Sequence, residues 1–274
     1  TTRRSKNSAD YFRKMKLNRK IKSQFDTDGY CTSEWLFSKK EIKDFEKEFD
    51  KIIKQIKLTN EGINARWGSN LTKKIESDNS VVLHTHNVQS YSSTMLKMIQ
   101  NKRFLDIAEL LIGPDIILHH TKLFLKPSKI GSAFPLHQDW SYFPTKKNSM
   151  IAAVVHLSKS NEKMGCLRVV PKSHKLGKIQ SSDGHTWNKK IHQNHDLEST
   201  FPIVAKKGDV LFFHCCTIHG SFPNTSSFDR KTVLIQLYSG QDKIIGEDNH
   251  TNVQLVLRGW NHSATRNTVN NILS

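Results

Sequence analysis

The pattern of apolar residues changes at Gly113-Pro114, and this change limits the folds that the chain can adopt. Upstream of it, apolar residues recur at the spacing of amphipathic helices, whereas downstream they form short runs between turn residues. We expect strands at residues 116–125, 150–157, 167–170, 210–214 and 231–238. Helices followed by several short strands predict an α+β, mainly β fold, a jelly roll of two antiparallel sheets with the N-terminal helices packed on one sheet.

Two helices are expected before this change. Ser38 and Glu41 have the spacing of a capping box, and the apolar residues that follow recur on one helical face, at Ile42, Phe45, Phe49, Ile52, Ile53 and Ile56. We interpret this apolar stripe as a face that packs on the core. A second helix should run over residues 94–111, because the Gly-Pro pair that follows is a strong stop signal.

Residues 1–24 are rich in Lys and Arg, which predicts a basic arm that is either disordered or a weak helix, and a single domain is expected over residues 25–274. The chain has 42 Lys and Arg against 25 Asp and Glu, a formal charge of +17. Such a surface attracts anions, so nucleic acid, acidic membranes and phosphorylated or CoA-linked substrates all stay open as partners. A lysine-rich solvated surface without such a partner explains the charge equally well.

The four cysteines, Cys31, Cys166, Cys215 and Cys216, include no C-x-x-C pair, and the last two are adjacent. This argues against a disulfide framework and against a zinc site. A reducing compartment follows, so we expect an intracellular location, cytoplasmic or organellar, with peroxisome and mitochondrion both open. No apolar run approaches the length of a membrane span.

His137-Gln138-Asp139 places a histidine and a carboxylate two residues apart. In a strand, residues i and i+2 lie on the same face, so His137 and Asp139 can bind one metal ion while Gln138 faces away. A histidine from a distant strand would complete the triad of non-haem Fe(II) oxygenases, which leaves positions open for a chelating co-substrate and dioxygen. His219 is our candidate, and His214 competes with it in the same stretch.

Around these residues, over roughly positions 104–240, the chain resembles the phytanoyl-CoA dioxygenase family. The motifs that carry the resemblance are Phe134-x-x-His137-x-Asp139, then Gly165-Cys166-Leu167 with Pro171, Ser173 and His174, then Gly208-Asp209, and finally His219-Gly220-Ser221 with Asn224 and Arg230. One departure is Lys172, where the family usually has glycine in a turn. The resemblance implies a double-stranded β-helix of the cupin-like type, iron ligands at His137, Asp139 and His219, and structural roles for His174 and His214.

Arg230 can hold a carboxylate through two parallel hydrogen bonds. When the keto-acid end of 2-oxoglutarate binds iron, its distal carboxylate needs such a partner, and the offset of eleven residues from His219 is the one that the resemblance implies. Thr232 shares the face of the same strand, and Ser221 is a second hydroxyl that could hydrogen-bond the co-substrate. For Thr232, ordinary strand propensity is an equally good explanation.

Candidates for substrate contacts are Gln138, Trp140, Tyr142 and Trp187, although core packing explains the aromatic residues near the metal motif at least as well. Trp187 belongs to residues 181–200, a long polar segment that we predict to be a mobile lid over the pocket.

In that lid, Lys189 and Lys190 would face an anionic substrate, and a surface insertion far from the site is the alternative. His119 and His120 are adjacent, and adjacent strand residues face opposite ways, so we do not expect them to share a metal ion.

The resemblance implies an Fe(II)- and 2-oxoglutarate-dependent dioxygenase that hydroxylates an unactivated C–H bond of a small-molecule or acyl-CoA-type substrate, with release of succinate and CO2. O2 is the other co-substrate, and ascorbate could stimulate turnover. Two alternatives stay open. An oxygenase of the same superfamily could act on nucleic acid or protein, although no run of aromatic and basic residues suggests base stacking. A catalytically silent jelly-roll binding module is the second, but it would have no reason to retain His137, Asp139, His219 and Arg230.

Overall fold

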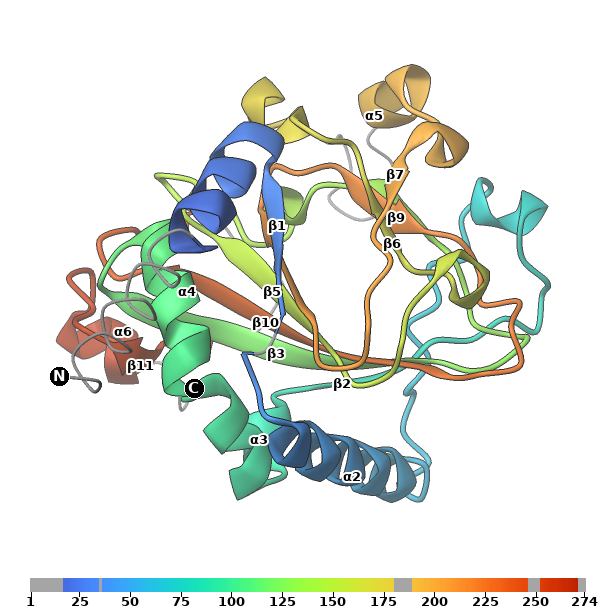
Figure 1. Cartoon of the computed structure of the whole chain (residues 1–274), viewed down its shortest axis with the longest axis horizontal. Coiled ribbons are helices and arrows are strands. Elements are labelled where there is room, and N and C mark those ends of the chain that lie inside the picture. Colours follow the sequence, from blue (N-terminus) through green and yellow to red (C-terminus); the bar gives the residue numbers. More distant parts are fainter. Residues whose placement is uncertain (1–16, 35, 180–188, 246–251, 271–274) are drawn as a thin grey trace, which may run out of the picture.

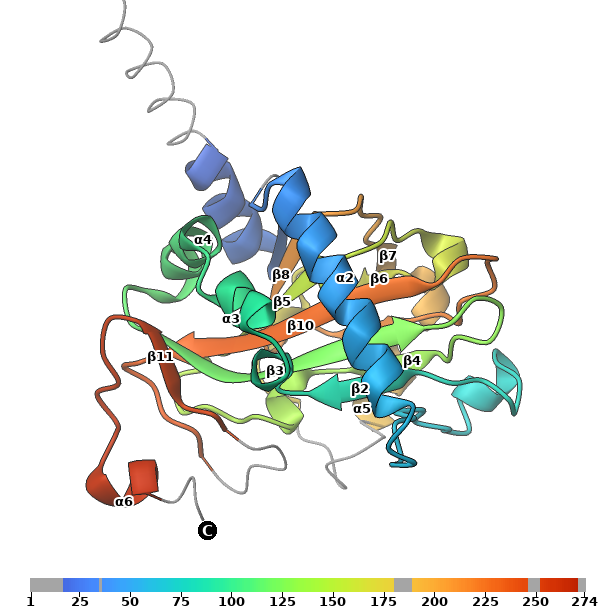
Figure 2. The same ribbon diagram turned by 90° about the horizontal axis from the view of Figure 1, so that it is seen from below.

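Two antiparallel sheets face each other in this protein, and helices cover the outer side of the larger sheet (Figures 1 and 2). The computed structural model describes residues 17–34, 36–179, 189–245 and 252–270. The larger sheet has the order β1-β8-β5-β10-β3-β11, and β2 also pairs with β3. The smaller sheet has the order β4-β9-β6-β7. Neighbouring strands pair antiparallel, as the predicted jelly roll requires.

The strands of the larger sheet are β1 (Tyr30–Ser33), β2 (Leu83–His86), β3 (Ile116–Lys126), β5 (Ile151–His156), β8 (Val210–His214), β10 (Arg230–Ser239) and β11 (Leu255–Arg258). Those of the smaller sheet are β4 (Phe134–His137), β6 (Leu167–Val169), β7 (Phe201–Pro202) and β9 (His219–Ser221). The helices include α2 (Lys39–Ile56), α3 (Ser93–Ile99), α4 (Lys102–Ile112), α5 (Lys189–Asn194) and α6 (Arg266–Asn270).

The five strands expected from the sequence are all present, with ends that differ by no more than one residue. The strands that the sequence analysis did not anticipate, β1, β2, β7, β9 and β11, have two to four residues each. Runs this short carry too few residues for a period of two to be visible. Their partners in the sheet determine that they are extended.

Alternation along β3 and β10 gives the larger sheet two different sides. The paired residues Leu123 and Val233 pack with the helices in the main hydrophobic core. The neighbouring pair, Lys122 and Leu234, points the other way and lines a cavity between the two sheets. The helices therefore stabilise one side of this sheet and leave the other side for a binding site.

Helix α2 confirms the predicted amphipathic helix and its capping box. The backbone N–H of Glu41 donates to the Ser38 side chain, and the Ser38 N–H donates to the Glu41 carboxylate at 2.6 Å. All six apolar residues of the predicted stripe are buried.

The single helix expected over residues 94–111 is wrong in one respect, because the chain forms two helices there. Helix α3 ends at Ile99, and Asn101 then begins α4, since its side chain accepts hydrogen bonds from the backbone N–H groups of Arg103 and Phe104. A residue that caps a new helix cannot also continue the preceding one. The predicted stop is confirmed, because α4 ends at Ile112 and is followed by Gly113, whose φ is +97°.

The described part of the basic arm takes the helical form of the two that were expected. Residues 17–28 are helical, and Ile21 and Phe25, four positions apart, are buried in the main core. Two apolar residues on one helical face are enough to dock the segment, so a disordered arm does not extend to residue 24. Residues 1–16 of the predicted arm lie outside the described residues.

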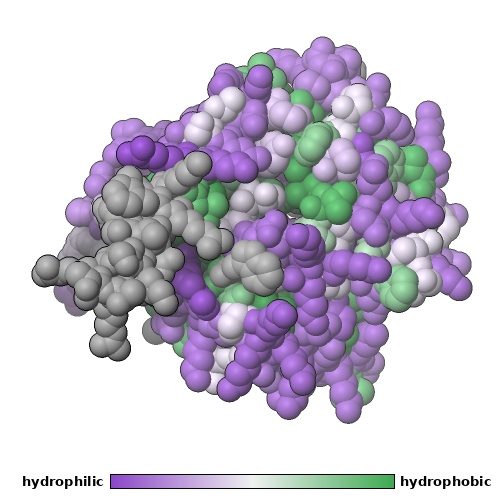
Figure 3. Space-filling view, in the orientation of Figure 1, coloured by the Kyte–Doolittle hydropathy of each residue, from purple (hydrophilic) through white to green (hydrophobic). Residues whose placement is uncertain are grey.

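Hydrophilic side chains cover most of the face shown in Figure 3, in keeping with the formal charge of +17. Among the described helices, none combines the length and the apolar character needed to cross a bilayer.

Phe49 tests the contribution of the helical layer to stability. Its side chain is fully buried between α2 and the larger sheet, so we expect Phe49→Ala to lower the free energy of unfolding by about 3–5 kcal/mol. Leu58→Ala, just beyond the same helix at a residue that is 76% exposed, is the matched control and should change it by less than about 0.5 kcal/mol. Urea denaturation measures both, and equal losses would contradict this packing.

Candidate metal and co-substrate site

Strands β4 and β9 pair in a register that places His137 directly opposite His219, with ring centroids 4.2 Å apart. Asp139 follows two residues after His137, at the start of a short 3-10 turn (Asp139–Ser141). Its Oδ1 lies 3.8 Å from His137 Nε2 and 3.5 Å from His219 Nε2. The three side chains therefore offer one ligand atom each to a common point. Asp139 reaches it from the turn and not, as the spacing assumed, from the strand itself.

Both imidazoles are oriented by carbonyl groups of the backbone. His137 Nδ1 lies 2.8 Å from the Pro135 oxygen, and His219 Nδ1 lies 2.9 Å from the Thr217 oxygen. An Nδ1–H that donates to a carbonyl leaves Nε2 without a proton, and Nε2 is the atom that faces Asp139. Burial, assisted by the neighbouring His219, also holds the pKa of His137 well below its ordinary value. His137 is thus neutral, as a metal ligand must be.

The carboxylate is held from the opposite sheet. Gln236 on β10 donates from Nε2 to Asp139 Oδ2 at 2.7 Å, and Gln236 is fully buried. This hydrogen bond occupies one carboxylate oxygen and leaves Oδ1 facing the two histidines. Gln236 is therefore a positioning residue for the triad, which the sequence analysis did not identify.

The residues on either side of Asp139 are attached to the segment that follows β8. Gln138 Nε2 donates to the carbonyl oxygens of Cys216 and Gly177, at 2.7 and 2.9 Å, and the backbone N–H of Trp140 donates to the Cys215 oxygen at 3.0 Å. Gln138 and Trp140 are not among the residues that line the cavity, so the structure does not bring them together with Tyr142, the described substrate candidate that does line it. The amide of Gln138 already has backbone partners, and Trp140 packs in a small apolar cluster.

One cavity of about 460 Å³ lies between the sheets and connects the predicted residues. The three metal-ligand candidates, the three co-substrate candidates and Tyr142 all line it, namely His137, Asp139, Tyr142, His219, Ser221, Arg230 and Thr232. Trp187, the remaining substrate candidate, lies outside the described residues.

Arg230 and Lys126 place two buried cations near one end of this cavity. Lys126 donates to Ser221 Oγ at 2.7 Å and to the Phe222 oxygen at 2.8 Å, and Arg230 donates from Nη1 to the Gly165 oxygen. The Arg230 Nε is buried without a hydrogen-bond partner. Burial lowers the pKa of Arg230 to about 10, and burial together with Arg230 holds the pKa of Lys126 well below its ordinary value.

No carboxylate of the described residues forms an ion pair with either cation. The Glu76 carboxylate acts on Lys126 from beyond ion-pair distance and is itself paired with Arg66, so an anionic ligand in contact with these buried cations would offset part of the cost of burying them. The sequence analysis missed Lys126, although a lysine inside an apolar strand is unusual enough to have been a signal.

The backbone at the first position of the Gly165-Cys166-Leu167 motif requires glycine. Gly165 has a φ of +63°, and a Cβ at this position would lie 2.3 Å from the Phe222 oxygen. Only glycine allows that approach, and the Gly165 carbonyl is the group that orients Arg230. Lys172, the departure from the family pattern, has a φ of +68° in a turn, where glycine would be unstrained.

The expectation for His119 and His120 is wrong in its geometry. The pairing of β10 with β3 shifts by one residue between Gln236 and Leu237, and this bulge brings His119 Nδ1 within 2.6 Å of His120 Nδ1. Neither ring lines the cavity.

The predicted lid is described only in part, because residues 180–188 lie outside the described residues. Helix α5 begins at the end of that gap, and its Ile191 is buried against Leu136 and Ile218. Lys190 is exposed. The described end of the segment is thus anchored beside β4, next to the metal ligands.

Comparison with known proteins identifies the family. Residues 25–232 match the family model described as phytanoyl-CoA dioxygenase (PhyH). The chain belongs to this family. It is 30% identical to the human protein "Phytanoyl-CoA dioxygenase, peroxisomal" over 224 residues, and this aligned region covers 76% of this chain and 64% of the human protein. It is 26% identical over 223 residues to "Probable alpha-ketoglutarate-dependent hypophosphite dioxygenase" of Stutzerimonas stutzeri, covering 76% of this chain and 73% of the relative.

The chain therefore spans less than two thirds of the length of its human relative. Among solved structures it resembles the epimerase SnoN in complex with Fe3+, alpha ketoglutarate and nogalamycin RO, with a TM-score of 0.71 and 19% identity over 88% of this chain and 99% of that one. It also resembles EctD from S. alaskensis with bound Fe, with a TM-score of 0.64 and 21% identity over 87% of this chain and 83% of that one. These likenesses confirm the cupin-like jelly-roll fold.

Gln236→Leu tests the role assigned to the Asp139–Gln236 hydrogen bond. Without the donor, the carboxylate loses its fixed orientation, and we expect the affinity of the triad for Mn(II) to fall by about 10–100-fold. Gln55→Leu, an exposed position of α2, is the control and should leave it unchanged. Anaerobic calorimetric titration measures both affinities, and equal values for the two variants would exclude the positioning role.

Proposed function

We propose that this protein is an Fe(II)- and 2-oxoglutarate-dependent dioxygenase that hydroxylates an unactivated C–H bond of a small molecule or of the acyl part of a larger substrate. His137, Asp139 and His219 would hold the iron, and Arg230 would hold the distal carboxylate of 2-oxoglutarate. The observation that carries this proposal is one cavity lined by both the triad and Arg230, with the buried Lys126 paired with Arg230 on the neighbouring strand. Dioxygenase names among the relatives support the reaction class.

The triad fits Fe(II) by the chemistry of its donors. Two imidazoles and one carboxylate, all from one side, suit non-haem Fe(II) and leave the cavity side open for further ligands. Bound iron with 2-oxoglutarate and O2 supplies the oxidising chemistry, which protein side chains cannot supply themselves. The protein's part is to hold these groups, to orient the substrate bond and to keep water out.

The Arg230 end fits 2-oxoglutarate by charge and by hydrogen bonding. A carboxylate there would accept from the partnerless Nε of Arg230 and would oppose the charges of Arg230 and Lys126. Thr232, on the same strand face and 3% exposed, adds a hydroxyl to that end of the cavity. Ser221 already accepts from Lys126, so its part would be to position that ammonium group.

The substrate end of the cavity is mostly aromatic and apolar. Trp67, Phe134, Tyr142 and Phe143 line it beside His137, so this part would enclose the carbon skeleton whose C–H bond reacts. A cavity of about 460 Å³ accommodates a compound of drug size, or one end of a longer molecule, together with the co-substrate.

For the location we propose a reducing compartment, cytoplasmic or organellar. The four cysteines are all free and buried, and none forms a disulfide. The human relative is named as peroxisomal, which supports an organelle as one possibility.

Substitution of each metal ligand tests the iron site. We expect His137→Ala, Asp139→Ala and His219→Ala each to weaken Fe(II) binding by more than about 100-fold, since losses outside the ligand shell already cost 10–100-fold. Turnover of 2-oxoglutarate to succinate should stop in all three. His214→Ala, in the neighbouring histidine–cysteine cluster, should retain iron. Iron retained by all three ligand variants and lost from His214→Ala would move the site to that cluster.

Arg230→Ala tests the co-substrate site. Removing one partner of a guanidinium–carboxylate pair in a desolvated site costs about 2–5 kcal/mol, so the Michaelis constant for 2-oxoglutarate should rise more than tenfold. Iron affinity measured without 2-oxoglutarate should not change. Arg258→Ala is the control, because Arg258 pairs with Asp106 and Glu109 away from the cavity. An unchanged Michaelis constant in Arg230→Ala would show that another cation holds the distal carboxylate.

The reaction itself is tested by screening C–H substrates for stimulation of succinate formation. The protein could bind iron at the triad and still convert no 2-oxoglutarate, either alone or with any of the screened substrates. That result would instead support the silent binding module.

A further inference from the structure

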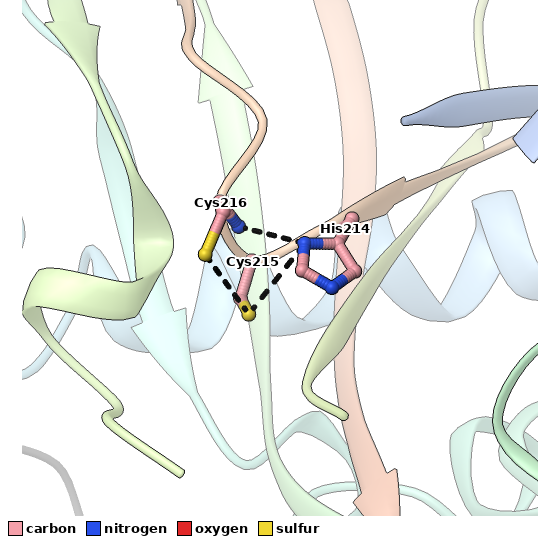
Figure 4. A group of neighbouring side chains, drawn as sticks. All are labelled: His214, Cys215 and Cys216. Atoms are coloured by element: carbon pink, nitrogen blue, oxygen red, sulfur yellow. Dashed lines mark hydrogen bonds between the residues drawn. The ribbon is translucent and has the colours of Figure 1, made fainter. Parts of the chain in front are cut away.

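A second group of metal-ligating side chains lies where β8 ends. His214, Cys215 and Cys216 turn their ring and thiols toward one another, as Figure 4 shows, and one ligand atom of each lies within 4.8 Å of the others. Cys215 Sγ is 4.0 Å from Cys216 Sγ and 3.9 Å from His214 Nδ1. Spacing alone argues against a metal site here, because adjacent strand residues point in opposite directions. The turn after β8 removes that restriction, since Thr217 N–H donates to the His214 oxygen at 2.8 Å.

The imidazole presents an unprotonated nitrogen to this turn. The backbone N–H of Cys216 donates to His214 Nδ1 at 3.1 Å, so Nδ1 carries a lone pair and no proton. That is the tautomer in which Nδ1 can bind a metal ion, and a bound ion would replace the N–H as its partner.

The two thiols differ in their pKa. A hydrogen bond from Cys215 is the main cause that lowers the pKa of Cys216 to about 5, and burial raises the pKa of Cys215. Lys178, whose charge also lowers the pKa of Cys216, places a cation near the pair. Two cysteine sulfurs and an imidazole nitrogen are a soft donor set, unlike the nitrogen and oxygen donors of the triad.

The distance between the sulfurs allows both to bind one ion. Two sulfurs that each lie about 2.3 Å from an ion can be at most about 4.6 Å apart, and the separation of 4.0 Å falls within this limit. The group offers three donors, two sulfurs and one imidazole nitrogen. We propose that His214, Cys215 and Cys216 form a second metal site, selective for a soft, three-coordinate ion of the Cu(I) type.

The surroundings of the three side chains suit a bound ion of this kind. Cys215 and Cys216 are no more than 1% exposed, which protects a thiolate-bound ion from water. A second cavity, of about 450 Å³, reaches His214 and is lined also by His174 and Asp26, so an ion can arrive past the imidazole. The site does not depend on iron or on 2-oxoglutarate, and it stands even if the proposed oxygenase activity is wrong.

Anaerobic titration with Cu(I), in competition with a chromogenic Cu(I) chelator, tests the site directly. The titrated protein is free of iron, and a thiol count first establishes that all four cysteines are reduced. We expect one Cu(I) per chain, and copper X-ray absorption should show two sulfur ligands and one nitrogen ligand. Wild-type protein that yields its Cu(I) fully to the chelator would overturn the proposal, as would a spectrum without sulfur ligands.

Variants assign the ligands. Cys215→Ser with Cys216→Ser should weaken Cu(I) binding by more than about 100-fold, and His214→Ala, which keeps both thiols, should weaken it by about 10–100-fold and remove the nitrogen ligand from the spectrum. Two double variants are the controls, and both should leave Cu(I) affinity unchanged. One replaces the other two buried cysteines, Cys31→Ser with Cys166→Ser, and the other is His137→Ala with Asp139→Ala. Loss of Cu(I) in either of these control pairs, with retention in the Cys215 and Cys216 pair, would place the ion elsewhere.

Discussion

The pairing of β4 with β9 is the constraint on which the rest of the site depends. It sets His137 opposite His219 on the smaller sheet, at ring distances that allow both to reach one point. Asp139 completes that point from the following turn, and its second oxygen is bonded to Gln236 on the larger sheet. One hydrogen bond thus links the two sheets at the metal ligands. Slippage of β4 by one residue would turn His137 to the other face and remove the site.

Two buried cations, Lys126 and Arg230, dominate the electrostatics at the far end of the cavity. Lys126 is fully buried and Arg230 is 7% exposed, yet their partners are hydroxyl and carbonyl oxygens and no described carboxylate. Burial of two cations in this way lowers stability, and the fold sustains it through the packing of α2 to α4 on the opposite side of the larger sheet. A ligand carboxylate would offset that cost at the place where the co-substrate has to be oriented. In the proposed function, the triad and the two cations are therefore two parts of one binding site.

Sequence reasoning succeeded where a pattern is long or a chemical requirement is strict. The six-residue stripe of α2 and the ten- or eleven-residue strands β10 and β3 repeat often enough to be recognised, and the ligand types of the triad follow from metal chemistry. It failed where a single side chain or backbone bond decides the outcome. Asn101 divides a helix by capping its second half, and a bulge brings the rings of His119 and His120 together. The roles of Lys126 and Gln236 were not predicted, because they arise only when the two sheets face each other.

A crystal structure of the protein with Mn(II) and 2-oxoglutarate, with the metal located by its anomalous scattering, tests the central claim most directly. The account predicts one Mn(II) bound by His137 Nε2, His219 Nε2 and Asp139 Oδ1, with the distal carboxylate of 2-oxoglutarate on the Arg230 guanidinium. A metal bound away from these three atoms, or a distal carboxylate that does not contact Arg230, would contradict it.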